Sequence, residues 1–294
     1  MTERVSGAPA NIDTAVLLTH LDGDGTLAAA EAAADVAERN GCRLVATAEE
    51  VSKHPGIADR LGMVDELPSE PDVCLVLGGD GTILRALRTF GANGVPVFGI
   101  NYGTIGFLAA VEREELDRGL DLAFTGQFDV MELPGLELGV EGAGPLGLND
   151  VSFTRQPHRR VAELAYLVGG EEIGHVRCDG LVAATPAGST GYNLANQGPV
   201  LAWGVEGYAV SFIAPHTLTA RPLVVAPSDV LQVQNAGSRD AVDIALDGQP
   251  AGELGPGQEV EVRFRATVGR LAQLPGSSFY RRMREKFGAI VALA

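Results

Sequence analysis

The 294-residue sequence is poor in cysteine and contains no long apolar run, and each shortage excludes a class of protein. Its three cysteines, Cys42, Cys74 and Cys178, are odd in number and widely spaced, which excludes a disulfide framework and a cysteine-based zinc site. Glycine and charged residues interrupt every apolar segment before it reaches the length of a membrane span. The start of the chain lacks the basic and apolar segments of a signal peptide. We therefore expect a cytoplasmic protein.

Lysine is almost absent, since Lys53 and Lys286 are its only occurrences, and 38 acidic residues oppose 22 basic ones. The net charge of −16 disfavours binding to nucleic acid and to anionic membranes, because both repel an acidic surface. An acidic, lysine-poor composition suits a cytoplasm at high salt, where ions screen the repulsion within the chain. We expect a salt-adapted source such as an archaeon, and the alternative is an ordinary acidic cytosolic protein.

The scarcity of lysine also excludes the nucleotide-binding loop G-x-x-x-x-G-K-[ST], of which the sequence has no copy. A phosphate site must therefore use backbone N–H groups, arginine and metal ions. One Gly-rich stretch suited to this is GGDGT at residues 78–82. Five apolar residues at 73–77 predict a buried strand before it, and apolar residues at helical spacing between Ile83 and Phe90 predict a helix after it.

The turn between that strand and helix is a candidate ligand site. Ligands of α/β proteins bind at the carboxyl ends of strands, and the free N–H groups at a helix start favour an anion. Asp80 is the one acid in the turn, so we expect its carboxylate to bind a metal, hold a hydroxyl group or accept a proton. The alternative is a structural turn in which Asp80 caps the helix.

Hydrophobic periodicity divides the chain into two domains. Up to residue 126, short apolar strands alternate with helices, which predicts a parallel α/β domain for residues 1–126. Period-two alternation with Gly and Pro turns predicts an antiparallel β-sandwich domain for residues 127–274. A basic amphipathic segment at 277–288 predicts a final helix, and we expect residues 275–294 to return to the α/β domain.

Two further motifs lie in the predicted β domain. TPAGSTGY at residues 185–192 is a second Gly-rich stretch in which a helix is predicted to begin at about Thr190, and Arg177 and Asp179 precede the stretch. Such a loop presents several N–H groups to one ligand, and a nearby carboxylate suits recognition of ribose or adenine. Asn149 and Asp150 combine an amide with a carboxylate, which together bind vicinal hydroxyl groups. The alternatives are a tight structural crossing and an Asn-Asp turn.

HLDGDGTL at residues 20–27 is a competing motif. Its Asp22-x-Asp24 pattern is similar to the nucleophile motif of haloacid-dehalogenase-like phosphatases, in which the first aspartate attacks phosphorus. That chemistry also requires a lysine well downstream and a late acidic pair that holds magnesium. Lys53 comes too early, Lys286 lies at the end of the chain, and no acidic pair stands out at a strand end between them. We interpret the motif as a solvated loop.

The motifs together resemble the NAD kinase family over most of the chain. The segments that carry the resemblance are, in chain order, GGDGTILR at 78–85, NYGTIGFL at 101–108, LND at 148–150, DGLVAATPAGSTGYNLANQGP at 179–199, ARPLV at 220–224, DGQ at 247–249 and SFYRRMREKFG at 278–288. GGDGT alone is shared with diacylglycerol, sphingosine and phosphofructo-kinases, so the resemblance depends on the order and spacing of the whole set.

The resemblance implies ATP-dependent phosphorylation of the 2′-hydroxyl of the adenosine ribose of NAD, giving NADP. It implies Mg²⁺ or another divalent cation with ATP, and no metal tightly bound by protein side chains. On the family pattern Asp80 is the catalytic residue and accepts the hydroxyl proton. The implied substrate- and nucleotide-binding residues are Gly79, Gly81, Arg85, Phe107, Asn149, Asp150, Arg160, Arg177, Asp179, Thr190, Gly191, Tyr192, Asn193, Leu194, Ala195 and Gln249.

The family pattern also implies separate roles for these residues. Arg85 pairs with a phosphate, Phe107 packs against a base, and residues 190–195 surround the adenine and ribose. Asp179 reaches the site of a neighbouring subunit in a homodimer or homotetramer. The sequence leaves open the choice between NAD and NADH, and between ATP and polyphosphate.

Two alternative functions belong to different classes. A diacylglycerol-type lipid kinase shares GGDGT, but it needs an apolar cleft or a basic membrane face, and this acidic chain offers neither clearly. A non-catalytic dinucleotide sensor would keep both Gly-rich loops without needing Asp80. Replacing Asp80 therefore discriminates between an enzyme and a sensor.

Overall fold

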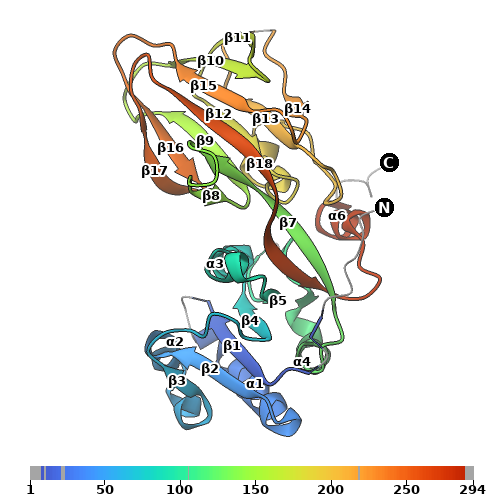
Figure 1. Cartoon of the computed structure of the whole chain (residues 1–294). Helices are drawn as coiled ribbons and strands as arrows, with labels where there is room; N and C mark the ends of the chain where they lie inside the picture. The colour runs from blue at the N-terminus through green and yellow to red at the C-terminus, as the bar shows by residue number, and fades with distance from the viewer. Residues whose placement is uncertain (1–7, 10, 21–23, 105, 218, 289–294) are drawn as a thin grey trace. The chain divides into compact units, whose positions relative to one another are not determined.

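The computed structural model describes residues 8–9, 11–20, 24–104, 106–217 and 219–288 (Figure 1). The chain forms two compact units, the first made of Met1–Glu132 with Gly269–Ala294 and the second of Leu133–Val268. It enters the second unit within strand β7 (Asp129–Leu138) and leaves it within strand β18 (Glu259–Gln273). Each unit has its own hydrophobic core.

The first unit is built on a parallel sheet with the strand order β3-β2-β1-β4-β5, and the end of β18 pairs in parallel with β5. The strands are β1 (Thr14–Thr19), β2 (Arg43–Thr47), β3 (Gly62–Val64), β4 (Val73–Gly78) and β5 (Pro96–Asn101), with the two-residue β6 (Val111–Glu112) beside β5. Every residue of β4 and β5 is buried, because helices cover both faces of the sheet.

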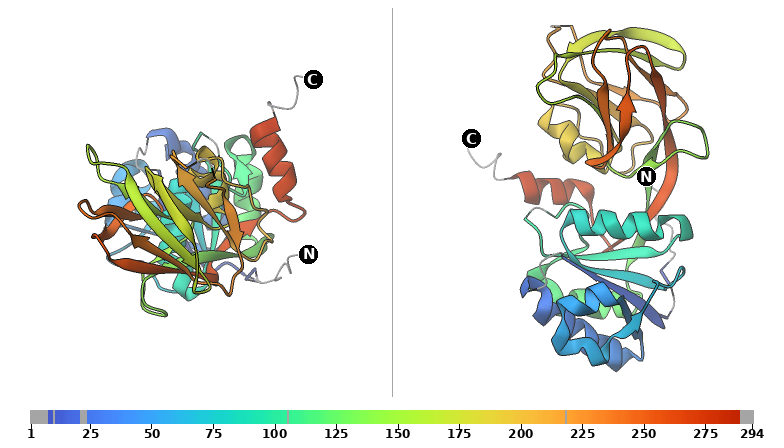
Figure 2. Two further views of the ribbon diagram at one scale, coloured as in Figure 1. Left: turned by 90° about the horizontal axis from the view of Figure 1, so that it is seen from above. Right: turned by 90° about the vertical axis from the view of Figure 1, so that its left-hand side faces the viewer.

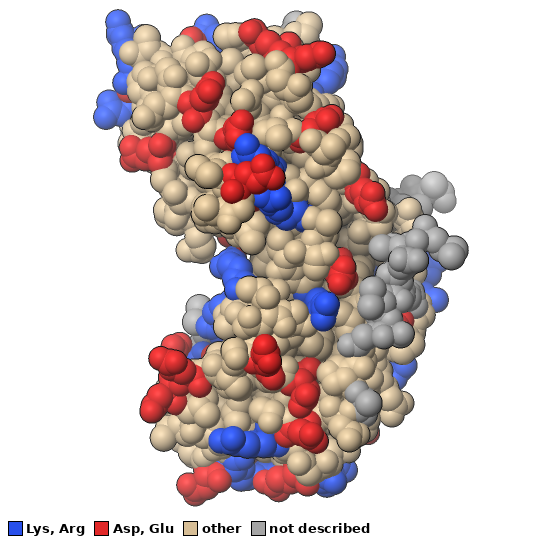
Figure 3. Space-filling model, viewed as in Figure 1, with Lys and Arg blue, Asp and Glu red and all other residues tan. Residues whose placement is uncertain are grey.

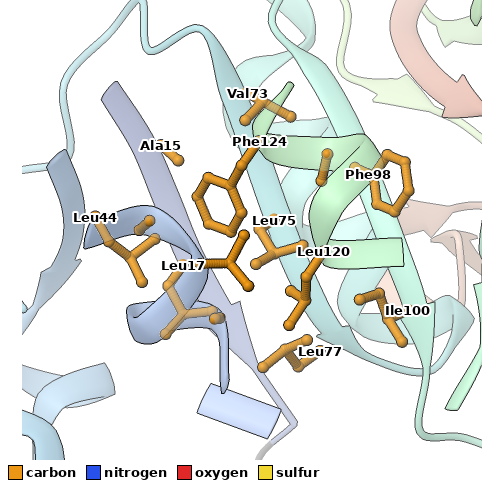
Figure 4. Packing of buried hydrophobic residues seen from close by; sticks show 14 of the residues in the cluster. Ala15, Leu17, Leu44, Val73, Leu75, Leu77, Phe98, Ile100, Leu120 and Phe124 are labelled. Atoms are coloured by element: carbon orange, nitrogen blue, oxygen red, sulfur yellow. The ribbon is translucent and has the colours of Figure 1, made fainter. Parts of the chain in front are cut away.

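The described residues of this unit form five α-helices: α1 (Leu27–Asn40), α2 (Ala48–Lys53), α3 (Asp80–Phe90), α4 (Leu116–Phe124) and α6 (Phe279–Phe287). They lie on both faces of the sheet (Figure 2). On one face, Leu17 and Leu75 pack with Leu120 of α4 (Figure 4). On the other face, Gly99 lies against Ile83 of α3. The predicted parallel α/β domain is confirmed.

The second unit contains two antiparallel sheets that share one core. One has the order β14-β13-β12-β9-β16-β17, and the other includes β11-β10-β15-β18. The additional strands are β8 (Leu146–Gly147), β9 (Asp150–Arg155), β10 (Ala162–Val168), β11 (Glu171–Cys178), β12 (Gly180–Ala184), β13 (Tyr208–Ile213), β14 (Leu223–Val225), β15 (Leu231–Asn235), β16 (Val242–Leu246) and β17 (Gln249–Leu254). Alternate residues such as Leu231 and Val233 enter the core. The predicted antiparallel β-sandwich is confirmed.

The helix predicted from about Thr190 is only one turn long. A 3₁₀ turn at Gly188–Thr190 comes first, and α5 spans Tyr192–Ala195. Gly191 separates them because its backbone, with φ −96° and ψ −122°, is not helical. The stretch is therefore a compact loop with two short turns.

The cysteines, the apolar segments and the charged side chains were also the subject of sequence-based expectations. All three cysteines are buried free thiols. No helix among the described residues is long and apolar enough to cross a membrane. Acidic and basic side chains are interspersed on the face shown in Figure 3. Within the competing HLDGDGTL motif, Asp22 lies outside the described residues, and Asp24 begins a 3₁₀ turn that leads into α1.

Candidate active site

Asp80 lies at the junction of strand β4 and helix α3. The strand ends at Gly78, Gly79 is the residue before the helix, and Asp80 is its first residue. The Asp80 carboxylate accepts hydrogen bonds from the backbone N–H groups of Phe107 and Leu108, each at 2.9 Å. Asp80 therefore binds a second loop and does not cap its own helix.

The second loop follows strand β5 and lies close to the Gly-rich turn. Tyr102 N donates to Gly78 O at 3.1 Å, and the backbones of Gly79 and Gly103 are in contact. A Cβ atom on Gly103 would lie 2.8 Å from the Cα of Gly79, so this approach requires glycine. The two motifs GGDGT and NYGTIGFL thus form one structure at the carboxyl edge of the parallel sheet.

Helix α6 holds the same loop from its other side through Arg282. Arg282 Nη1 donates to the carbonyl oxygens of Phe107, at 2.6 Å, and Ala109, and its Nη2 donates to Gln273 Oε1 at 2.6 Å. The rings of Phe107 and Phe287 pack with their centroids 5.1 Å apart. Burial lowers the pKa of Arg282, and the charge of Asp80 opposes this shift. Sequence reasoning did not assign a role to Arg282, which it cited only as part of a basic amphipathic helix and of the SFYRRMREKFG segment.

Arg85 lies on α3 but contacts residues beside strand β1. Its Nη2 donates to Glu50 Oε1 at 3.0 Å and to Thr19 O at 3.1 Å. Glu50 is only 3% exposed and also forms an ion pair with Lys53 at 2.8 Å. Thr19 donates its backbone N–H and its hydroxyl to Glu50 Oε2, at 3.0 and 2.8 Å. Arg85 is therefore held by a buried carboxylate that sequence reasoning did not identify.

In the second unit, Asp247 organises the Asn149–Asp150 turn. Its carboxylate accepts hydrogen bonds from the backbone N–H groups of Leu148, Asn149 and Asp150 at 3.1, 2.6 and 3.2 Å. Asp247 has a left-handed backbone with φ 47°. Burial and the charge of Asp247 raise the pKa of Asp150 to about 7. Sequence reasoning cited Asp247 only as part of DGQ.

The TPAGSTGY loop packs directly on this turn. Thr185 N donates to Asn149 O at 2.9 Å, and the Thr185 hydroxyl donates to Leu148 O at 2.7 Å. A Cβ atom on Gly188 would lie 2.0 Å from Asn149 O, so only glycine fits there. The Oδ1 atom of Asn149 is buried and has no hydrogen-bond partner among the described residues. The structure thus brings together the two motifs that the sequence predicted in the β domain.

The six residues implied at 190–195 differ in exposure. Gly191, Tyr192 and Ala195 are exposed, while Thr190 and Leu194 are half-buried. Asn193 is fully buried, and its Nδ2 donates to Ser189 O and Pro199 O at 3.1 and 2.9 Å. Asn193 therefore stabilises the loop.

The other implied residues lie elsewhere in the second unit. Arg160 and Arg177 line a pocket of about 220 Å³. Asp179 accepts a hydrogen bond from Arg155 Nε at 2.6 Å. Gln249 is exposed at the start of β17. Asp179 lies close enough to the TPAGSTGY loop for its charge to act on Tyr192.

Comparison with known proteins identifies the family. Residues 30–128 match the model of the ATP-NAD kinase N-terminal domain, and residues 148–268 match that of the ATP-NAD kinase C-terminal domain. The chain is 38% identical over 255 residues to the NAD kinase of Symbiobacterium thermophilum, covering 83% of this chain and 90% of that one. It is 34% identical over 288 residues to NAD kinase 2 of Streptomyces avermitilis, covering 95% of each chain.

Two solved structures share the fold. Yeast NADH kinase complexed with NADH matches with a TM-score of 0.83 at 21% identity, covering 97% of this chain and 90% of that one. An NAD kinase from Archaeoglobus fulgidus in complex with ATP matches with a TM-score of 0.71 at 24% identity, covering 96% and 100%. Together with the family models and the relatives, these findings show that the chain is an enzyme that belongs to the NAD kinase family.

Proposed function

We propose that the enzyme transfers the γ-phosphoryl group of ATP to the 2′-hydroxyl of the adenosine ribose of NAD, giving NADP. The observation that carries the proposal is the placement of Asp80. Its carboxylate lies at the end of β4 and the start of α3, and two N–H groups from another loop fix it. A carboxylate held in this way is suited to accept the proton of a hydroxyl group that attacks phosphorus.

We propose the following phosphoryl transfer at this carboxylate. The 2′-oxygen attacks the γ-phosphorus, the bond from that phosphorus to the β,γ-bridging oxygen breaks, and Asp80 takes the hydroxyl proton. The substrate is ATP with a divalent cation, for which we propose Mg²⁺, which shares the charge of the phosphoryl group. A Cβ atom on Gly81 would meet no other atom within 4 Å, so the backbone at the start of α3 is open to a ligand. The N–H groups at the start of a helix favour phosphate.

In the second unit, we propose that Asn149 and Asp150 hold a ribose of NAD. The buried Oδ1 of Asn149 is an acceptor that a ribose hydroxyl satisfies. The exposed Gly191 and Tyr192 are proposed to contact the adenosine, whereas Asn193 acts through the loop that it stabilises. The further binding roles of Arg160, Arg177 and Gln249 are part of the same proposal.

Arg85 and Phe107 are each in contact with another side chain of the first unit. We propose that Arg85 binds a phosphate of ATP while Glu50 holds the guanidinium in place. Phe107 is only 5% exposed and its ring packs on Phe287, so we propose that this residue acts through its N–H group and not by stacking on a base.

A coupled assay tests the proposal. The enzyme is incubated with NAD, ATP and Mg²⁺ over a range of salt concentrations, and NADP is measured with an NADP-specific dehydrogenase. We expect NADP to form, Asp80→Asn to lower kcat by at least about 100-fold, and NAD binding by calorimetry to be largely retained. Asp22→Ala, in the competing motif, is the matched control and should keep activity.

The outcomes separate the alternatives. If no NADP forms at any salt concentration, the proposed function is wrong. If NADP forms and Asp80→Asn keeps its turnover, Asp80 is not the proton acceptor. If Asp22→Ala alone abolishes activity, the HLDGDGTL motif carries the chemistry.

A further inference from the structure

The Arg282 guanidinium and the Asp80 carboxylate are joined by a single peptide group. Arg282 Nη1 donates to the carbonyl oxygen of Phe107 at 2.6 Å. The N–H of the same peptide group, on Leu108, donates to Asp80 Oδ1 at 2.9 Å. Because a peptide group is planar and rigid, fixing its oxygen also fixes the direction of its N–H.

The neighbouring peptide groups are held as well. Phe107 N donates to Asp80 Oδ2 at 2.9 Å, so both carboxylate oxygens are engaged. Gln273 Nε2 donates to Leu108 O at 3.1 Å, and Gln273 Oε1 accepts from Arg282 at 2.6 Å. Arg282 also donates to Ala109 O. Three consecutive carbonyl groups are thereby held by two side chains from the C-terminal part of the chain.

We propose that Arg282 is a positioning residue for phosphoryl transfer, which orients the Asp80 carboxylate through the Phe107–Leu108 peptide group. The proposal deepens the proposed function and rests on the role of Asp80 in it. The positive charge of Arg282 polarises the peptide group and strengthens the hydrogen bond at its far end. Fixing the carboxylate matters because proton transfer requires a defined orientation of the acceptor.

The contacts of helix α6 single out Arg282. Arg281 and Arg284 on the same helix are exposed, and Lys286 pairs with Glu112 Oε1 at 2.5 Å. Arg282 is partly buried and reaches three acceptors in the loop and at Gln273. Its charge also interacts with that of Asp80.

The test compares Arg282→Met, which keeps an unbranched stem but removes the guanidinium donors, with the exposed control Arg281→Met. We expect Arg282→Met to lower kcat by about 100-fold, while KM for NAD and ATP changes less than about threefold. Arg282→Lys should recover part of kcat. Added guanidinium should partly restore the kcat of Arg282→Ala. Arg281→Met should behave as the wild type.

A double-mutant cycle separates positioning from simple support of the fold. If Arg282 acts through Asp80, adding Arg282→Met to Asp80→Asn causes no further loss of kcat, because the two residues act as a unit. If the losses multiply, or if Arg282→Met keeps wild-type kcat, the inference is overturned. If Arg282→Met does not fold, Gln273→Met replaces it in the double-mutant cycle, and we expect a smaller loss of kcat from this variant. A Gln273→Met variant with wild-type kcat would then overturn the inference.

Failure of the inference is distinguishable from failure of the proposed function. An active wild type with an inactive Asp80→Asn and a fully active Arg282→Met rejects only the inference. A wild type without NADP formation rejects the proposed function itself.

Discussion

Asp247 and Asp150 lie side by side in the second unit, and their interaction has two opposing parts. The Asp247 carboxylate accepts a hydrogen bond from the Asp150 backbone N–H at 3.2 Å, while its charge repels the Asp150 side chain. Burial contributes more than this repulsion, and together they raise the pKa of Asp150 from 3.8 to about 7. The same residue thus holds the turn in place and favours a protonated Asp150.

This arrangement predicts a pH-dependent stability. Between pH 4 and 7 the folded state binds the Asp150 proton more tightly than the unfolded state, so the free energy of unfolding falls as the pH rises through this range. Asp150→Asn should abolish this fall in the free energy of unfolding with rising pH. At pH 8 the variant should therefore be more stable than the wild type by on the order of a few kcal/mol. Urea unfolding at pH 5 and pH 8 measures the change in the free energy of unfolding between these pH values. The exposed control Glu253→Gln should keep the wild-type dependence of the free energy of unfolding on pH. The same dependence in Asp150→Asn as in the wild type would contradict the prediction.

A second prediction concerns Asp247 itself. Asp247→Ala leaves three N–H groups without their acceptor and places alanine in a left-handed conformation, so we expect a loss of about 1–3 kcal/mol in the free energy of unfolding. KM for NAD should rise, because Asn149 and Asp150 lose their support. Asp247→Asn should be much milder, since asparagine tolerates φ 47° and keeps one carbonyl acceptor. If Asp247→Ala and Asp247→Asn changed the free energy of unfolding and KM for NAD equally, neither the left-handed backbone at residue 247 nor its side-chain acceptor would matter.

A third prediction concerns Arg85. If its guanidinium binds a phosphate of ATP, Arg85→Met should raise KM for ATP by about tenfold and leave KM for NAD unchanged. Glu50→Gln should act in the same direction, because the buried carboxylate holds Arg85, and it should also lower stability by about 1–3 kcal/mol. Arg88→Met, an exposed arginine on the same helix, is the control. If Arg85→Met lowers only stability, Arg85 is structural.

The sequence was sufficient to predict the two kinds of domain and the two Gly-rich loops, but it overestimated the helix at the second loop, which is only one turn long. Local periodicity predicted the strand before Asp80 and the helix after it, since both signals lie within a few residues. It also predicted the antiparallel strands of the second unit from their alternation. The roles assigned to individual site residues stay predictions.

The contacts that hold the candidate site were not predictable from local patterns. Arg282 meets the carbonyl of Phe107 across a sequence separation of 175 residues, and Asp247 meets Asn149 across 98. Glu50 sits in an ordinary helical pattern and reveals its burial only through its partners. Tertiary contacts of this kind leave no periodic signal in the chain.

A fourth prediction follows from the net charge of −16. If the composition reflects a salt-adapted source, Tm should rise by about 3–10 °C between 0.1 and 2 M KCl, because screening reduces self-repulsion among the acidic groups. Differential scanning calorimetry measures it, with an equal concentration of sorbitol as an uncharged control. Full stability and activity without added salt would favour an ordinary acidic cytosolic protein.

A last prediction concerns Asp179, which pairs with Arg155 within one chain and is proposed to serve the site of a neighbouring subunit of a homo-oligomer. Two inactive chains, Asp80→Asn and Asp179→Asn, are co-expressed with different tags, and oligomers that carry both tags are purified. If each site combines Asp80 of one chain with Asp179 of the other, one of the two sites in a mixed dimer contains both native residues. The purified mixed dimer should then recover about half of wild-type activity. If both residues act within the same chain, every site in the mixed dimer carries a substitution and no activity returns. Co-expressing two differently tagged Asp80→Asn chains controls for recovery caused by oligomerisation alone.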